Sequence, residues 1–433
     1  MITFDQILVE LGIAFASYGD GLRSLDWLIA NRDLNGRVRL IAPESVKVDE
    51  TRLAIVRNLA ADVAKRLGRH AHPSEAIILF DDTREEALQG ASAFALEGYD
   101  NVWVADRLGT EGDWAHIADA SKGAPRVVFF SIKGGVGRSS ALAATAWAFA
   151  QAGKRVLVLD LDLESPGLSS SLLPDRQQPQ FGITDWLVED LVDNGDAVFQ
   201  DLRSLSGLSH DGEIYVVPAH GAVPGEYVAK LARVWMPKIA ADGARQKWSA
   251  RLGRLIDALE QRMQPDIILI DSRAGIDEVA SACVTELGAK LILLFALEGS
   301  QTWTGYRMLF EHWLRHGKAS NIRDSLQIVG ALLPETGRDD YFRGLQDNGY
   351  NLFADTLYDA IPAGEIIGDR FHFEAPDESA PHCPWGVKWH RSFAGLRSLH
   401  GRIAEIDADE VRSIFGPLIR GIADRLDMEH VYD

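Results

Sequence analysis

The sequence predicts an α/β fold with a doubly wound, mainly parallel sheet, preceded by a small N-terminal α/β domain. From residue 126 onward, short and almost wholly apolar segments recur. Each is followed by loop and helix-like sequence, which is typical of parallel strands covered on both faces. A glycine-rich loop joins the first of these segments to a helix-like stretch. The length of 433 residues also exceeds that of one ordinary single-core domain.

Residues 1–120 are the first predicted domain, because they have their own alternation of strand-like and helix-like segments. Strands are predicted over 37–43, 75–82 and 101–107, and helices over 51–67 and 84–96. The segment ADASKGAPR, residues 118–126, contains glycine and proline and marks the predicted boundary. The second predicted domain spans residues 125–433.

Six apolar segments of the second domain predict strands, over residues 126–132, 155–162, 213–219, 266–271, 290–297 and 326–333. The pattern becomes looser after Pro334. Residues 371–392 are rich in proline, histidine and tryptophan and predict an ordered loop, and residues 409–427 predict a final amphipathic helix. Acidic residues flank that helix, so we expect its apolar face to pack on the core and not on a membrane.

The composition favours a protein of the cytoplasm. Hydrophobic residues make up 46% of the chain and charged residues 25%, as in soluble globular proteins. No segment approaches the roughly 18 consecutive apolar residues that a membrane span needs. The two cysteines, Cys283 and Cys383, provide no disulfide framework. The formal net charge of −19 disfavours direct binding to DNA or to an anionic membrane surface.

The glycine-rich loop, SIKGGVGRSS at residues 131–140, has the features of a phosphate-binding loop. Glycine lets the main chain approach a ligand closely, and successive N–H groups at the start of a helix attract anions. Lys133 and Arg138 add positive charge, and Ser139 offers a hydroxyl to a magnesium ion. A strand-to-helix turn that binds nothing is the alternative. The order of strand, loop, cations, serine and helix favours phosphate binding.

The segment KGGVGRSS resembles the deviant Walker A box of the ParA/MinD family of P-loop ATPases, which is KGGxGK followed by serine or threonine. The resemblance covers about residues 126–335 and includes four further segments. VLVLDLDLESPG resembles the family's second strand with its Asp-x-Asp, and FGITDWL the short segment after it. EIYVVPAHG resembles a strand that ends in Pro-Ala, and DIILIDSRAG the Walker B strand. The resemblance implies a P-loop NTPase fold with a divergent C-terminal part, about residues 335–433.

The resemblance implies that the loop binds ATP with Mg²⁺. Lys133 would reach across a dimer interface to the partner's nucleotide and take part in catalysis with Arg138. Ser139 would bind magnesium, and Ser140 would lie near the α-phosphate. Backbone N–H groups would surround the phosphates at Gly134, Gly135, Val136, Gly137 and Arg138.

Three aspartates complete the implied site. Asp160 would support the magnesium shell, Asp162 would orient the attacking water, and Asp271 would hold a magnesium-bound water. Such a site suits phosphoryl transfer, which needs charge neutralisation and an aligned water more than covalent help from the protein. The alternative is that the three aspartates cap or turn the chain at strand ends.

The chain departs from the family pattern at three places. Arg138 replaces the P-loop lysine, and a planar guanidinium holds phosphates differently from a compact ammonium, so binding is a safer prediction than fast hydrolysis. DSRAG lacks the family's paired prolines and places Ser272 and Arg273 in the switch, where Arg273 is either a charge stabiliser or a surface arginine. LLPETGRDD, residues 332–340, lacks the asparagine that often contacts the base, so adenine is implied by the family alone.

The implied function is an ATPase switch that dimerises around Mg-ATP, hydrolyses it slowly or with a partner's help, and serves positioning or bacterial stress or defence signalling. The alternative is a nucleotide-binding adaptor without turnover, or a scaffold. The domain 1–120 is expected to bind an unidentified protein partner or to regulate the ATPase. Within it, Asp81, Asp82 and Asp106 follow strand-like segments and either form an acidic pocket or are ordinary polar strand ends.

A second cluster of metal-binding residue types lies in the late loop, at His372, His382, Cys383 and His390. Zinc sites use such side chains, but the spacing matches no standard Cys/His motif. A folded polar loop explains the cluster as well, and Trp385 and Trp389 are expected to anchor its packing.

Overall fold

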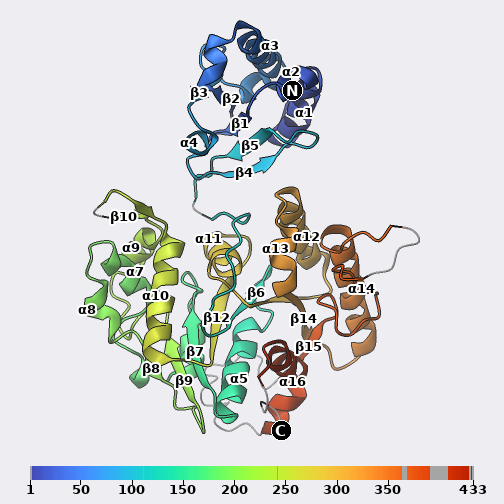
Figure 1. Ribbon diagram of the computed structural model, residues 1–433. Coiled ribbons are helices and arrows are strands. Elements are labelled where there is room, and N and C mark those ends of the chain that lie inside the picture. The colour runs from blue at the N-terminus through green and yellow to red at the C-terminus, as the bar shows by residue number, and fades with distance from the viewer. Residues whose placement is uncertain are drawn as a thin grey trace. The chain divides into compact units, whose positions relative to one another are not determined.

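The computed structural model describes residues 2–110, 112–240, 242–362, 368–390, 408–428 and 431 (Figure 1). The chain divides into two compact units, Met1–Ala115 with Arg315–Gly317, and His116–Leu314 with Lys318–Asp433. Part of the predicted C-terminal region, at residues 363–367 and 391–407, lies outside the described residues, as do the last two positions of the predicted loop 371–392.

The N-terminal unit contains a five-stranded mixed sheet in the order β3-β2-β1-β5-β4. Its strands are β1 (Leu28–Arg32), β2 (Val38–Pro43), β3 (Ile78–Asp81), β4 (Ser92–Ala95) and β5 (Val102–Asp106). Its helices are α1 (Ile7–Ala16), α2 (Gly19–Arg23), α3 (Glu50–Leu67) and α4 (Arg84–Leu88). Apolar residues of α1 and α3 pack on one face of the sheet, in a core that includes Phe15, Leu40, Val56 and Val102. The small N-terminal α/β domain is therefore confirmed.

The helix predicted over 84–96 is wrong in its second half. Helix α4 ends at Leu88, and Gln89 and Gly90 follow with positive φ angles of 46° and 73°. Two successive residues in this region turn the chain, and β4 then pairs antiparallel with β5. The apolar spacing of this segment fits a short helix followed by a half-buried strand as well as it fits one helix.

The acidic pocket considered for the N-terminal unit is not formed. β1 pairs parallel with β5 but antiparallel with β2, and β3 pairs parallel with β2. The carboxyl ends of β3 and β5 therefore lie at opposite edges of the sheet, which separates Asp81 from Asp106. Asp106 instead forms an ion pair with the buried Arg32, its register partner on β1.

The second unit is built on an eight-stranded sheet in the order β15-β14-β13-β6-β12-β7-β9-β8, and every pair except β8 with β9 is parallel. The predicted doubly wound, mainly parallel sheet is thus confirmed. The strands are β6 (Arg126–Ser131), β7 (Arg155–Asp160), β8 (Ser204–Leu205), β9 (Glu213–Val217), β12 (Ile267–Ala274), β13 (Leu291–Ala296), β14 (Leu326–Leu333) and β15 (Trp385–Lys388). A short hairpin pairs β10 (Lys238–Ile239) with β11 (Arg245–Gln246).

Helices flank this sheet along the chain (Figure 1). They are α5 (Arg138–Gln151), α6 (Leu168–Leu172), α7 (Ile183–Asp190), α8 (Gly195–Phe199), α9 (Tyr227–Val234), α10 (Trp248–Met263), α11 (Glu278–Ser281), α12 (Ser300–Arg315), α13 (Ala319–Ile322), α14 (Arg338–Thr356) and α16 (Ala408–Arg425). Helices α5 and α16 bury their apolar residues in one core with one face of the sheet. On the other face, Phe130 of β6 contacts Tyr306 of α12.

The described residues after Pro334 contain more regular secondary structure than the sequence pattern predicts. Helix α14 follows β14 directly, and β15 adds an edge strand inside the segment predicted as a loop. Trp385 of β15 packs so closely on α16 that a Cβ atom at Gly421 would lie 2.5 Å from its ring. The strand assignment depends on pairing with β14, and a four-residue segment carries too little periodicity to predict it. Among the described helices, none is both long enough and apolar enough to cross a membrane.

Candidate nucleotide-binding site

The glycine-rich loop connects the centre of the sheet to α5. Strand β6 ends at Ser131, and α5 begins at Arg138 with Gly137 as its N-cap. Gly135 and Gly137 have φ angles of +74° and +81°, a backbone region that glycine adopts without strain. Lys133 is exposed, and within the described part of the chain its ammonium has no hydrogen bond or ion pair. The loop therefore has the main-chain conformation and the free positive charge of an anion-binding turn.

Two aspartates meet beside this loop because their strands are neighbours. β12 lies between β6 and β7, and Asp271 of β12 is in register with Asp160 of β7. Both side chains are buried. Burial and then the charge of Asp271 raise the pKa of Asp160 to about 7. Asp162 follows two residues after β7, and burial raises its pKa as well.

Arg138 and Ser139 point from the first turn of α5 toward these acids. Arg138 donates from Nε to Asp271 Oδ1 at 2.6 Å and from Nη2 to Asp162 Oδ2 at 3.4 Å. Its Nη1 also lies 3.5 Å from the hydroxyl of Ser131. Ser139 Oγ donates to Asp271 Oδ2 at 2.6 Å. Each carboxylate oxygen of Asp271 thus accepts one short hydrogen bond from the start of α5.

The residues present also fit a magnesium ion. Asp160 accepts a hydrogen bond at Oδ2 from the main chain of Ser169, whereas its Oδ1 is buried and has no partner among the described residues. An unpaired buried carboxylate oxygen is costly unless a cation or an ordered water approaches it. Magnesium is usually held by one or two carboxylates together with water and phosphate oxygens. The described residues contain no group of three or more His, Cys, Asp or Glu side chains arranged for a metal.

Arg273, considered from the sequence as a charge stabiliser or a surface arginine, and Tyr227, which the sequence did not single out, both contact the segment after β7. Arg273, at the end of β12, forms ion pairs with Glu164 at 2.7 Å and with Asp277 at 3.1 Å, so it connects the segment after β7 to the start of α11. Tyr227 of α9 donates its hydroxyl to the main-chain oxygen of Leu163 at 2.6 Å, next to Asp162. Sequence analysis missed Tyr227 because it lies 64 residues from that contact.

The late histidine and cysteine cluster is not assembled around a common point. His382 is buried, with its Nδ1 2.5 Å from the hydroxyl of Tyr358 and its Nε2 3.1 Å from the main-chain oxygen of Ala375. The Nδ1 of His372 lies 3.1 Å from the main-chain oxygen of Asp359, and His390 pairs with Glu410. Each of these rings therefore contacts another protein group.

His382 gives the protein an acid-sensitive element. Burial lowers the pKa of His382, so below about pH 6.5 the unfolded chain takes up a proton that the folded chain does not. The free energy of unfolding should therefore fall as the pH drops, by at most about 1.4 kcal/mol per pH unit from this residue. Chemical denaturation between about pH 7.5 and pH 5.5 measures the effect. The His382→Gln variant should lose this component, and an unchanged pH dependence in the variant would contradict the assignment.

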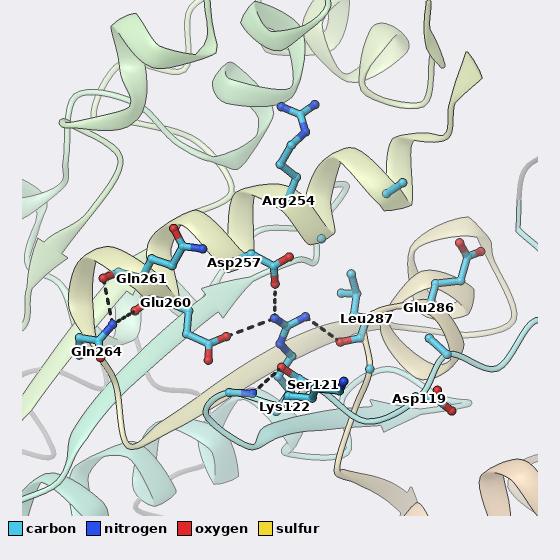
Figure 2. A pocket seen from close by; sticks show the side chains of 16 residues that line it. Asp119, Ser121, Lys122, Arg254, Asp257, Glu260, Gln261, Gln264, Glu286 and Leu287 are labelled. Atoms are coloured by element: carbon cyan, nitrogen blue, oxygen red, sulfur yellow. Dashed lines mark hydrogen bonds and ion pairs between the residues drawn. The ribbon is translucent and has the colours of Figure 1, made fainter. Parts of the chain in front are cut away.

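A separate pocket of about 750 Å³ lies at the amino end of β6, away from the glycine loop (Figure 2). Its base is Arg126, whose guanidinium binds Asp257 at 2.5 Å, Glu260 at 3.2 Å and the main-chain oxygen of Leu287 at 3.0 Å. Glu260 also accepts from the main chain of Ala124 at 2.6 Å. These bonds attach the segment before β6 to α10, and they explain the charged lining by internal pairing.

The family model described as CobQ/CobB/MinD/ParA nucleotide binding domain matches residues 127–407, more than half of the chain. A search of curated proteins found no match.

Solved structures with detectable similarity include three whose descriptions name a ligand. The pNOB8 ParA bound to nonspecific DNA is 16% identical, with 71% of this chain and 100% of that chain covered and a TM-score of 0.43. The septum site-determining protein MinD complexed with Mg-ADP, from Pyrococcus horikoshii OT3, is 24% identical, with coverages of 50% and 72% and a TM-score of 0.34. Cobyrinic acid a,c-diamide synthase from Mycobacterium smegmatis, with an ATP analogue and magnesium, is 19% identical, with coverages of 55% and 86% and a TM-score of 0.37.

Proposed function

Because the chain belongs to the family of CobQ/CobB/MinD/ParA nucleotide-binding domains, we propose that it is an ATP-dependent switch that dimerises around Mg-ATP and hydrolyses it. The observation that carries the proposal is the position of the glycine loop. Its two left-handed glycines and the start of α5 lie beside a buried pair of aspartates in register, Asp160 and Asp271. A site for both a triphosphate and a cation needs this combination of main-chain N–H donors and carboxylates.

Each residue of the loop has a proposed part in nucleotide binding. Main-chain N–H groups of residues 134–138 surround the phosphates, Ser140 lies near the α-phosphate, and Lys133 supplies charge. The magnesium ion would be held by Ser139, with Asp160 and Asp271 around its shell, and would neutralise charge on the phosphates. Asp162, already fixed by Ser165 and Arg138, would orient the attacking water.

Exposed apolar side chains support the proposed dimer. Val223 and Val228, which follow the carboxyl end of β9, are 77% and 83% exposed, and Ile276, which follows β12, is 46% exposed. The carboxyl ends of parallel strands share one edge of a sheet, so these residues follow strands that end at the same edge as β6, which leads into the loop with the exposed Lys133. A face of this kind, with apolar side chains around an unpaired lysine, fits a second copy of the chain closing on the nucleotide.

The output of the switch is proposed to pass through a protein partner. The N-terminal unit has its own core and precedes the loop, so it is the proposed partner-binding or regulatory module. The net charge of −19 opposes direct binding to DNA or anionic membranes. Positioning of cargo and bacterial stress or defence signalling are both compatible with such a switch.

A nucleotide-binding adaptor without turnover is the second candidate, and the pairing of Arg138 favours it. A guanidinium bound to Asp271 and Asp162 is directed toward the acids and not toward the phosphate-binding turn. Phosphate release measured with and without candidate partners separates the two functions. Release under any of these conditions supports the switch, and its absence under all of them supports the adaptor.

The nucleotide site itself is tested by replacing one loop glycine. Gly135→Ala should weaken the binding of ATP with magnesium about tenfold or more, because a methyl group would stand where the main chain approaches the phosphates. Isothermal calorimetry with ATP and with ADP measures the loss. Gly153→Ala is the matched control, since Gly153 has a φ of +76° against +74° for Gly135, and a Cβ atom at either position meets nothing within 4 Å. Both variants should lose similar stability, and equal nucleotide affinity in the two would contradict the site.

A further inference from the structure

We propose that Arg138 is a latch that keeps Asp271 closed to the metal ion until a phosphate group draws the guanidinium away. This inference rests on the proposed function and concerns the order in which the site fills. Arg138, which replaces the P-loop lysine, would in this way also couple metal binding to phosphate binding.

The latch is closed because both carboxylate oxygens of Asp271 accept short hydrogen bonds from the start of α5. Arg138 Nε at 2.6 Å and Ser139 Oγ at 2.6 Å each use one of its two oxygens. The guanidinium also reaches Asp162 at 3.4 Å, and the Arg138 and Asp271 side chains are only 8% and 1% exposed. A charge-assisted hydrogen bond shielded from water competes strongly with a hydrated divalent cation for the same carboxylate.

The geometry of the guanidinium makes this contact specific to arginine. Its planar fork lets one side chain contact Asp271 and Asp162 through different nitrogens, whereas a lysine ammonium is a compact point charge. The replacement of lysine by arginine therefore changes more than the reach of one positive charge. It joins the two acids of the site through one side chain.

A phosphate group can open the latch because it is the better partner for the same fork. Arg138 is the first residue of α5, so its side chain starts from the turn that carries the main-chain donors for the phosphates. Phosphate oxygens bind guanidinium in pairs and carry more charge than one carboxylate. When Arg138 moves to them, Asp271 Oδ1 loses its bond to the guanidinium and becomes available to a cation, and Oδ1 of its register partner Asp160 already has no partner among the described residues. Metal and triphosphate therefore bind cooperatively, and the metal alone binds weakly.

The test uses Mn²⁺ as a paramagnetic probe on the full chain without nucleotide. Electron paramagnetic resonance of free Mn²⁺ should show that Arg138→Gln binds the ion about tenfold or more tightly than the wild type does. The double variant Arg138→Gln, Asp271→Asn should lose this gain, because the added affinity resides on Asp271. Arg155→Gln is the control: Arg155 forms an ion pair with Glu213 at the amino end of β7, so its loss changes the net charge equally and should leave Mn²⁺ binding unchanged.

The second arm uses ATP with a chelator and no metal. The wild type should bind ATP under these conditions, and Arg138→Gln should bind it about tenfold more weakly, since the arginine then faces the phosphates. Equal Mn²⁺ affinity of nucleotide-free wild type and Arg138→Gln would overturn the latch. Failure of every variant to bind ATP, with or without Mg²⁺, would instead refute the proposed function, while the Mn²⁺ comparison would still decide the latch. If Arg138→Gln does not fold, Arg138→Lys takes its place, with Mn²⁺ affinity expected above that of the wild type, and equal affinity would overturn the latch.

Discussion

Replacing Lys133 with alanine is expected to abolish the ATP-dependent dimer and to leave the fold unchanged. Lys133 is exposed and has no partner within the described residues, so its loss should change the free energy of unfolding by less than about 0.5 kcal/mol. In a dimer, the same ammonium would lie against the partner's phosphates, where no other side chain of the loop replaces its charge. Solution mass measured with ATP, with ADP and without nucleotide gives the result directly.

The control for this variant is a lysine that is equally exposed but remote from the loop. Lys290 precedes β13 at the amino edge of the sheet, opposite the carboxyl ends of the strands. Lys290→Ala should dimerise with ATP as the wild type does. A Lys133→Ala protein that still doubles its mass with ATP, or a wild type with the same mass in all three conditions, would contradict the proposed dimer.

The second large effect is expected for Asp271→Asn, which should reduce both stability and turnover. Removal of the charge leaves Arg138 buried with only the more distant Asp162 as an acidic partner. Breaking one side of a buried ion pair costs about 3–5 kcal/mol, and denaturant unfolding measures this loss. If the wild type hydrolyses ATP, the variant should do so about 100-fold more slowly, because the acid that supports the metal is lost.

A double variant separates these two roles of Asp271. Arg138→Met with Asp271→Leu replaces the buried pair by apolar side chains of similar size, which is often neutral or stabilising. We expect stability to recover toward that of the wild type and ATP turnover to stay as low as in Asp271→Asn or lower. Wild-type stability in Asp271→Asn alone would show that the ion pair is not a structural element, and recovered turnover in the double variant would exclude Asp271 from the chemistry.

The strands of the second unit were predictable because the sheet is covered on both faces. Segments such as 290–297 are apolar along their whole length, and β13 is buried at every position. Other elements gave weaker signals. α1, β1, α14 and β15 were not predicted, and the segment 84–96 was assigned to one helix when it forms a helix and a strand. The strands among them, β1, β4 and β15, have four or five residues and depend on pairing with other strands, which local periodicity does not record.

The candidate site, like the fold, was only partly predictable from the sequence. Local sequence was enough to place a glycine turn between β6 and α5 and to name Lys133, Arg138 and Ser139, because backbone conformation in a turn depends on the residues of that turn. Strand ends rich in aspartate were equally visible. The sequence did not show which group each charged side chain contacts, as the example of Arg138 illustrates.

By itself, the sequence determined the mainly parallel sheet and the position of the loop, and it predicted the type of ligand that such a loop accepts. Only the tertiary structure decided that Asp160 and Asp271 lie in register and that Arg138 binds Asp271, a residue 133 positions away. Strand order brings these groups together, and strand order is fixed by the packing of the whole core. A buried charged side chain points toward whichever oppositely charged group the fold places within hydrogen-bonding distance.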